Sequence, residues 1–352
     1  MRFLYKAFKD ELNQEEAVQI VNGLVDIRGE KFTPFEILKL ATKEGQLDSV
    51  CNRVFSDWKA EFIERKVEEA NEFLEQFGGL ERFHALAELW KRDTVVPFVG
   101  AGMSCTSGYP MWGDFLQNQR RQTNLSKEDL DAVLRRGEYE EAAENIATHM
   151  KGPAFSEAVE STFCANRSIN GPVLLLPQLF KKHVVTTNFD SVLERCYKDV
   201  ESTFSAVIRG SDSVELRRKL VGEQKILLKL HGEADSEKGR ILTKTEYERH
   251  YSETNTLSNT MGLLADRFSL LFMGCSLTVD RTLMALQEHV KKVGHANLQR
   301  HYAFLPAPDS ETDRIARQQL LVDYHIYPIW YPQYMHHESI SALLLKLWSM
   351  GR

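Results

Sequence analysis

The pattern of apolar and polar positions changes once along this chain, near residue 91. Before that point, apolar residues recur at helical spacing among many charged ones, most clearly over 57–77 and again over 81–90. After it, β-branched runs begin to alternate with helical stretches. We therefore predict a helical N-terminal domain over residues 1–90 and a second domain over residues 91–352.

Seven short apolar runs after residue 93 are predicted to be β-strands. They are continuous rather than alternating, which is typical of strands covered by helices on both faces. Helical stretches lie between them, and this alternation indicates βαβ units around a mostly parallel sheet. We therefore expect an α/β fold with a Rossmann-like sheet. The predicted strands are 94–99, 183–187, 203–208, 225–230, 269–274, 300–305 and 325–330, and the predicted helices between them include 112–121, 127–136, 139–149, 191–197 and 280–292.

Two features depart from a simple alternation of strand and helix. The segment from about 112 to 182 is largely helical and too long for an ordinary crossover, so we expect a helical insertion that covers the ligand pocket. Pro97 lies inside the first predicted strand, although proline cannot donate a hydrogen bond to a ladder. We expect Pro97 to lie at a bulge where the chain bends into the glycines that follow.

Composition limits the class of protein. With 352 residues, 43% of them apolar and 27% charged, the chain is typical of soluble globular proteins. No apolar run is long enough to span a membrane, and the first residues lack the pattern of a signal peptide. The five cysteines are scattered and never spaced as C-x-x-C, which favours a reducing, cytoplasmic setting and argues against structural zinc. The adjacent His336-His337 has no metal-ligand spacing either, so no metal is expected.

The net charge of −6 comes from the first quarter of the chain. Residues 1–90 contain 12 Lys and Arg against 18 Asp and Glu, and the remainder is balanced. Since no basic stripe is present, we do not expect nucleic acid to be the main ligand. The acidic helices are expected to be a solvated face, with docking to a basic partner as the alternative.

Four of the predicted strands run directly into short polar motifs. In an open parallel sheet, ligands bind beyond the carboxyl ends of the strands. We therefore expect these motifs to converge on one pocket. They are Gly100-Ala101-Gly102-Met103-Ser104, Thr186-Thr187-Asn188-Phe189-Asp190, His231-Gly232 and Gly274-Cys275-Ser276.

The first two motifs each have a chemical and a plainer interpretation. The glycines would let backbone N–H groups and a helix that opens near Met103 approach a pyrophosphate, and Ser104 would donate to a phosphate or ribose oxygen. The alternative is a simple turn, and the missing P-loop lysine argues against an ATPase. Asp190 is expected to cap the next helix. Asn188 is instead free to point into the crevice and hold a water or a ribose hydroxyl.

The other two motifs contain a candidate base and a glycine that lets the backbone come close to a ligand. His231 suits general acid/base chemistry, with a structural histidine as the alternative, and Gly232 would clear space beside the imidazole. Gly274 permits close backbone approach and Ser276 offers a hydroxyl. Cys275 has no flanking charge, so we expect a buried small residue rather than a nucleophile.

Taken in order over about residues 94–330, the motifs resemble the NAD-binding core of the sirtuins. The resemblance implies NAD as the substrate and Asn188 and His231 as the catalytic residues, with His231 as the general base. It also implies that the other motif residues contact the phosphates and riboses of NAD. These residues are Gly100, Ala101, Gly102, Met103, Ser104, Thr187, Asp190, Gly274 and Ser276.

Two departures separate the chain from sirtuin deacetylases. Those enzymes bind zinc through two cysteine pairs, which this chain lacks, and their first motif continues as Gly-Ile-Pro-Asp-Phe-Arg. Here the continuation is Gly108-Tyr109-Pro110-Met111-Trp112-Gly113-Asp114-Phe115. The chain is more similar to the sirtuin-like NAD hydrolases of bacterial antiphage defence.

That family implies an NAD⁺ glycohydrolase that yields nicotinamide and ADP-ribose. It also implies a homo-oligomer that is activated by assembly or by a defence partner such as a HerA-type ATPase. Two other functions stay open. One is a non-hydrolytic NAD- or ADP-ribose-binding regulatory module, and the other is an NAD-dependent deacylase of the sirtuin type.

Overall fold

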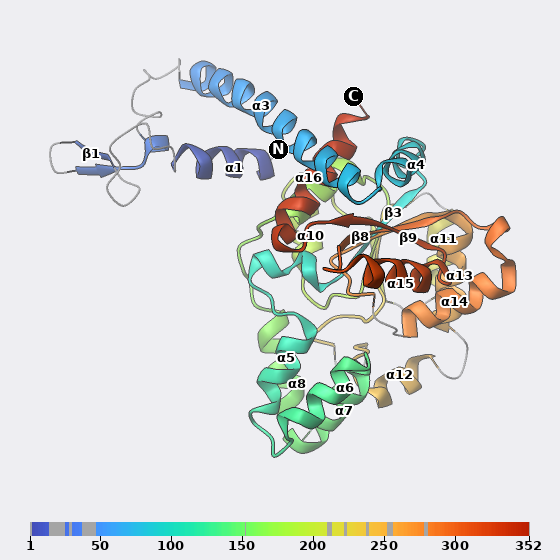
Figure 1. The fold of residues 1–352 in the computed structure, drawn as a ribbon. Coiled ribbons are helices and arrows are strands. Elements are labelled where there is room, and N and C mark those ends of the chain that lie inside the picture. Colours follow the sequence, from blue (N-terminus) through green and yellow to red (C-terminus); the bar gives the residue numbers. More distant parts are fainter. Residues whose placement is uncertain are drawn as a thin grey trace.

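A seven-stranded parallel sheet forms the centre of the protein (Figure 1). The computed structural model describes residues 2–13, 25–27, 30–36, 47–151, 153–209, 213–221, 224–236, 239–251, 256–277 and 281–351. The strand order is β5-β6-β4-β3-β7-β8-β9, and every neighbouring pair is parallel. The strands are β3 (Val95–Val99), β4 (Val184–Thr186), β5 (Ala206–Arg209), β6 (Ile226–Lys229), β7 (Ser269–Met273), β8 (His301–Pro306) and β9 (Ile326–Tyr331). The α/β class and the mostly parallel sheet predicted from the sequence are confirmed.

Both faces of the sheet are covered by helices, as the continuous apolar runs predicted. Alternate residues of a strand point to opposite faces. Val95 and Val99 of β3 belong to one buried cluster, and Val96 and Phe98 belong to the other. The first cluster includes residues of α3 (Leu47–Gln76), α4 (Leu80–Lys91), α10 (Val192–Lys198) and α16 (His336–Ser349). The second includes residues of α11 (Ser213–Val221), α12 (Lys244–Tyr251), α13 (Thr256–Arg267), α14 (Arg281–Val293) and α15 (Glu311–Val322).

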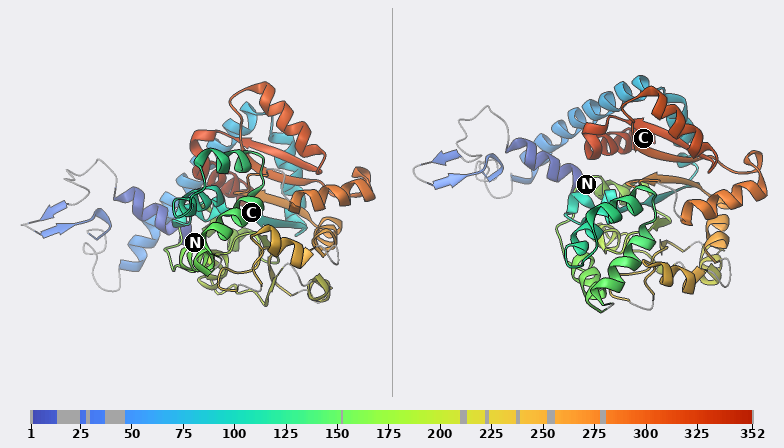
Figure 2. Two further views of the ribbon diagram at one scale, coloured as in Figure 1. Left: turned by 90° about the horizontal axis from the view of Figure 1, so that it is seen from below. Right: turned by 60° about the horizontal axis from the view of Figure 1, so that its bottom comes forward.

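The N-terminal region is mainly helical but also contains a short hairpin. It comprises α1 (Arg2–Leu12), the antiparallel strands β1 (Val25–Ile27) and β2 (Glu30–Phe32), and the helices α3 and α4. The sequence did not predict the hairpin. The first helix and the start of α3 project from the body of the protein (Figure 2). The later turns of α3 reach the core of the sheet through Ala70, Phe73 and Leu74. The domain boundary near residue 91 stays a prediction.

α3 ends at Gln76, just before a glycine pair at 78–79. Gly78 has a φ of +65°, which glycine adopts without steric cost. The amide of Gly79 donates to the carbonyl of Leu74 at 2.7 Å, and the amide of Gly78 donates to Glu75 at 3.2 Å. This pattern satisfies carbonyls that the helix end leaves without partners.

Several helices lie between β3 and β4, in the segment where a helical insertion is predicted. The helices are α5 (Trp112–Arg120), α6 (Lys127–Arg135), α7 (Tyr139–Met150), α8 (Pro153–Phe163) and α9 (Leu176–Leu179). The first three match the predicted segments at 112–121, 127–136 and 139–149 closely. α5, α6, α7 and α8 lie together on one side of the sheet (Figures 1 and 2).

Two local predictions for the first motif are wrong. Pro97 does not lie at a bulge, because β3 pairs one to one with β7 through Pro97 and Leu271, and pairing with β4 begins only at Phe98. The glycine turn also does not open an α-helix near Met103. It continues into two 3-10 turns, Ala101–Met103 and Cys105–Ser107, in which the amide of Met103 donates to Gly100 and that of Ser104 donates to Ala101.

Candidate active site

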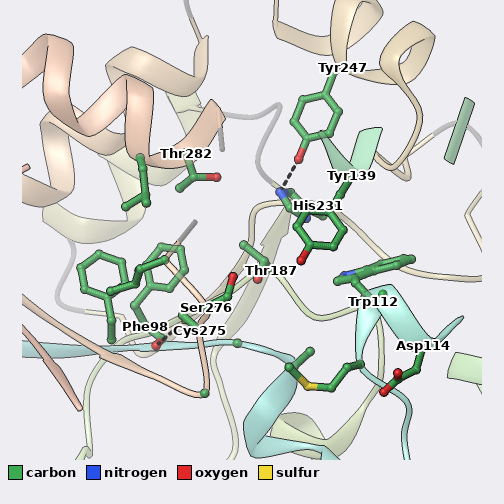
Figure 3. A pocket seen from close by; sticks show the side chains of 18 residues that line it. Phe98, Trp112, Asp114, Tyr139, Thr187, His231, Tyr247, Cys275, Ser276 and Thr282 are labelled. Atoms are coloured by element: carbon green, nitrogen blue, oxygen red, sulfur yellow. Dashed lines mark hydrogen bonds between the residues drawn. The ribbon is translucent and has the colours of Figure 1, made fainter. Parts of the chain in front are cut away.

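A cavity of about 280 Å³ lies beyond the carboxyl ends of β3, β4, β6 and β7 (Figure 3). All four strand-end motifs contribute to its walls. After β3, the chain adds β4 on one side of β3 and later adds β7 on the other side. Ligands of parallel sheets bind where the strand order reverses in this way. The motif residues in the walls are Gly100, Ala101, Thr187, His231, Gly274, Cys275 and Ser276.

The two glycine turns form the floor of the cavity by packing against each other. Gly100 donates its amide hydrogen to the carbonyl of Met273, and Gly102 donates to that of Gly274, both at 2.9 Å. A Cβ on Gly100 would lie 2.5 Å from the carbonyl oxygen of Gly274. A Cβ on Gly274, whose φ is +66°, would lie 2.5 Å from the amide nitrogen of Met103. Glycine is therefore needed where the two turns meet, and the amides of Gly100 and Gly102 already have partners.

Five of the predicted site residues lie behind this floor rather than in the cavity walls. Asn188 is the most informative of them, because its amide nitrogen donates to the carbonyl of Gly100 at 3.0 Å and to the hydroxyl of Ser104 at 3.2 Å. Its Oδ1 is buried and has no hydrogen-bond partner among the described residues. The five residues are Gly102, Met103, Ser104, Asn188 and Asp190, of which Met103, Ser104, Asn188 and Asp190 are at most 6% exposed.

Asp190 caps the following helix, and it also supports the Asn188 network. Its Oδ1 accepts a hydrogen bond from the amide of Val192 at 3.0 Å, at the start of α10. Burial raises the pKa of Asp190, while hydrogen bonds from Val192 and Ser104 oppose this effect. Because Ser104 contacts both side chains, Asp190, Ser104 and Asn188 form a buried chain of polar groups beneath the cavity.

A buried lysine fixes the loop that carries these residues. Lys229, the last residue of β6, is 2% exposed. Its ammonium donates to the carbonyl of Asp190 at 3.0 Å and to a carboxylate oxygen of Glu194 at 2.8 Å. A charged group is buried only when it is paired in this way. Lys229 therefore links the strand before His231 to the loop after β4.

His231 lies in the wall of the cavity, two residues beyond β6. Its Nε2 lies 2.7 Å from the hydroxyl of Tyr247. Burial lowers the pKa of His231 to about 4, so the imidazole is neutral at pH 7 and has a lone pair available for a proton. Gly232 has a φ of +73°, and a Cβ there would lie 1.9 Å from the carbonyl oxygen of Gly239. The chain that returns at Gly239 therefore requires a glycine at position 232. The sequence had predicted that the imidazole of His231 requires it.

The remaining walls come from side chains that the motifs did not reveal. Trp112 and Tyr139 reach the cavity from the helical region between β3 and β4, and Tyr247 reaches it from α12 (Figure 3). A second hollow of about 300 Å³ shares Trp112, Tyr139, His231 and Tyr247 with the cavity. The altered continuation of the first motif pointed to Trp112. No sequence signal pointed to Tyr247, because nothing in the chain marks which side chain of α12 contacts His231.

Cys275 and Ser276 occupy the far side of the floor. Cys275 is half-buried, with its Sγ 3.6 Å from the carbonyl oxygen of Met273. It therefore lines the cavity rather than lying fully buried. Ser276 is exposed and also faces a third hollow of about 320 Å³, lined in part by Arg317 and Trp330. Arg317 donates to the carbonyl of Ser276 at 2.9 Å and so fixes this turn.

The described ranges contain neither a cluster of metal-binding side chains nor a membrane-spanning helix. No three His, Cys, Asp or Glu side chains of these ranges are placed together to bind a metal ion. In the part of the chain that the structure describes, no helix is both long and apolar enough to cross a membrane.

Comparison with known proteins finds similarity to sirtuin-like proteins. The family model of the SIR2-like domain matches residues 182–329. NAD(+) hydrolase ThsA from Cytobacillus dafuensis is 26% identical over 272 residues, which cover 72% of this chain and 52% of that protein. ThsA from Enterococcus faecium is 24% identical over 232 residues, covering 62% of this chain and 44% of that protein.

Defense-associated sirtuin 2 from Bacillus subtilis is 25% identical over 219 residues, covering 59% of this chain and 20% of that protein. The chain spans about half the length of the ThsA proteins that it matches. These similarities confirm the resemblance drawn from the order of the motifs: residues 182–329 match the SIR2-like domain, and the chain is similar to NAD(+) hydrolases and to a defence-associated sirtuin.

Proposed function

We propose that this protein is an NAD⁺ glycohydrolase that depletes NAD in antiphage defence. The observation that carries the proposal is a neutral His231 imidazole in the cavity where four strand-end motifs meet. The names of the relatives, two NAD(+) hydrolases and one defence-associated sirtuin, support the same activity.

In this proposal, NAD lies across the floor formed by the two glycine turns. Gly100, Ala101, Thr187, Gly274 and Ser276 contact the dinucleotide directly, since they line the cavity. The hollow beyond Ser276 gives room for the part of NAD that a 280 Å³ cavity does not hold. The residues that support the floor and its contacts from behind are Gly102, Met103, Ser104 and Asp190.

The nicotinamide end lies toward the aromatic wall. Trp112 offers a ring face for stacking on the pyridine ring. Asp114, an exposed carboxylate in the same wall, favours the positive charge that this ring carries in NAD⁺. Both residues belong to the continuation that differs from the pattern of sirtuin deacetylases.

Cleavage breaks the bond between the pyridine nitrogen and C1′ of the ribose. The bonding pair leaves with nicotinamide, and C1′ passes through an oxocarbenium-like state, as in glycoside hydrolysis. A water oxygen then bonds to C1′, and His231 accepts the proton that this water loses before releasing it to solvent. Because the oxocarbenium carbon is strongly electrophilic, an imidazole whose pKa is about 4 is a sufficient base.

Asn188 lies behind the floor, and in this scheme it orients the ribose or the attacking water through the Gly100 and Ser104 groups to which it bonds. Its amide hydrogens already bond to Gly100 and Ser104, so Oδ1 is the atom left to accept a hydrogen bond. A buried acceptor without a partner costs about 1–3 kcal/mol. A water at Oδ1 would remove this cost.

We also propose that the protein forms a homo-oligomer and acts with a HerA-type ATPase or another defence partner. The projecting α1 supports self-association, since Tyr5 on this helix is 46% exposed. Analytical ultracentrifugation of the full chain, alone and with a HerA-type ATPase, tests both points. A chain that sediments as a monomer in both samples would contradict them.

The activity is tested by incubating the purified protein with NAD, with and without candidate partners, and separating the products by chromatography. We expect nicotinamide and ADP-ribose. The variants His231→Ala and Asn188→Ala should each lose about 10²–10⁴-fold in turnover and still bind NAD in calorimetry. His84→Ala removes an exposed imidazole on α4 and serves as the control.

Three other outcomes would refute parts of the proposal. Full turnover in both active-site variants would remove their catalytic roles. Tight NAD binding without nicotinamide release under any condition would indicate a regulatory binding module. Release that requires an acylated peptide would indicate a deacylase.

A further inference from the structure

The chain after His231 turns back and encloses the imidazole. The amide of Ile241 donates to the carbonyl of His231 at 2.9 Å. Two residues later α12 begins with a capping box, in which the Glu246 carboxylate accepts from the amide of Thr243 at 2.9 Å and the Thr243 hydroxyl accepts from the amide of Glu246 at 3.3 Å. The start of α12 is therefore fixed relative to His231.

One side chain of this helix contacts the imidazole. Tyr247 is 7% exposed, and its hydroxyl lies 2.7 Å from Nε2 of His231. The two rings are nearly perpendicular, at 77°, with centroids 5.5 Å apart. One turn later, the hydroxyl of Tyr251 donates to the carbonyl of Leu230 at 2.6 Å, which holds the other end of α12 against β6.

The Tyr247 ring also contacts a charged residue from another element. The guanidinium of Arg281, the first residue of α14, lies 5.2 Å from the ring centroid. Arg281 also donates to both carboxylate oxygens of Glu140 on α7 at 2.7 Å. The tyrosine is thus held between His231 and the helices that cover the cavity, so its hydroxyl has a defined position.

This contact decides which nitrogen of His231 meets a ligand. A neutral imidazole has one N–H donor and one acceptor nitrogen, and the partner of one nitrogen sets the state of the other. Because Tyr247 occupies Nε2, the nitrogen left for the cavity is Nδ1. A proton acceptor at Nδ1 requires that Nε2 carry the hydrogen and donate it to the oxygen of Tyr247.

We propose that Tyr247 is a positioning residue for His231: it accepts a hydrogen bond from Nε2–H and so leaves the Nδ1 lone pair directed at the reacting proton. The inference rests on the proposed function, since it assigns the base of that reaction. When Nδ1 takes up the proton from water, the positive imidazolium strengthens the Nε2–H bond to Tyr247. The role resembles that of the carboxylate in a catalytic triad, with a neutral oxygen in its place.

The tautomer is measured directly by ¹⁵N NMR of histidine-labelled protein at pH 7, without NAD. The signals of His231 are assigned by their loss in His231→Gln. We expect the Nε2–H tautomer in the unmodified protein and a mixture of both tautomers in Tyr247→Phe. Tyr251→Phe removes a buried hydroxyl from the same helix and should keep the Nε2–H tautomer. An Nδ1–H tautomer in the unmodified protein, or no change in Tyr247→Phe, overturns the proposal.

Kinetics supply the second readout. Tyr247→Phe should lower kcat for nicotinamide release by about 10–100-fold with little change in KM, because a misdirected base affects the chemical step rather than binding. Equal loss of kcat in Tyr247→Phe and Tyr251→Phe would show a merely structural role. If the unmodified protein releases no nicotinamide, the proposed function fails while the tautomer measurement still decides the role of the Tyr247 contact.

Discussion

Substitution of Gly274 by alanine tests whether the two glycine turns pack as tightly as the structure shows. Gly274 and Gly78 have nearly the same φ, +66° and +65°, but their surroundings differ. A Cβ on Gly274 would lie 2.5 Å from the Met103 nitrogen, whereas a Cβ on Gly78 would have nothing within 4 Å. The pair therefore separates the cost of the backbone conformation from the cost of steric overlap.

The expected loss of stability differs accordingly. The left-handed conformation costs an alanine about 1–2 kcal/mol, and this is the whole effect expected for Gly78→Ala. In Gly274→Ala, overpacking adds about 1–3 kcal/mol, which gives about 2–5 kcal/mol in total. An unfolding entropy of about 2.1 cal/mol/K per residue amounts to about 0.7 kcal/mol/K for 352 residues. We therefore expect Tm to fall by about 1.5–3 °C in Gly78→Ala and by about 3–7 °C in Gly274→Ala.

Differential scanning calorimetry of both variants at pH 7 provides the measurement. Equal Tm losses in the two variants would show that the space beside Gly274 is larger than the structure indicates. The glycine would then be explained by its φ alone, and the account of the cavity floor as two interlocked turns would be wrong.

Two further predictions concern buried charge. Burial lowers the pKa of His183 and His231 to about 4 and that of His301 to about 3, so below pH 6.5 the unfolded chain binds more protons than the folded chain. Tm should therefore fall as the pH is lowered from about 6.5 to 4, and a level Tm across this window would contradict the burial of these rings. Lys229→Met should lower the free energy of unfolding by about 2–4 kcal/mol, because it leaves Glu194 and the carbonyl of Asp190 without their buried cation. If urea denaturation shows that the free energy of unfolding falls by less than about 1 kcal/mol, water replaces the ammonium in this variant.

Much of the fold follows from the sequence because its central strands are buried on both faces. β3 and β7 consist almost entirely of apolar residues, and both are fully buried, so a continuous run marked each of them. The edge strand β5 is only partly buried, and its predicted start at residue 203 lies three residues before the observed start at Ala206. The hairpin of β1 and β2 has three residues in each strand, which is too short for a periodic signal.

The site residues that directly follow a strand could be predicted from the sequence. The residues whose side-chain direction depends on tertiary packing could not. The positions of Gly100, His231 and Gly274 in the cavity walls follow from the carboxyl ends of their strands. The direction of the Asn188 side chain does not follow from its position, because it depends on the hydroxyl of Ser104, 84 residues away. Tyr247 likewise meets His231 only because the chain turns back at Gly239.

The central place of β3 has a consequence for the synthesis of the protein. The floor of the pocket needs Gly100 to meet Gly274, and β7, which precedes Gly274 and pairs with β3, follows β4 and β6 in the chain. A ribosome has therefore made more than three quarters of the 352 residues before the pocket can close. A nascent or prematurely ended chain that lacks β7 therefore has no complete pocket, and the activity proposed above would arise only late in synthesis.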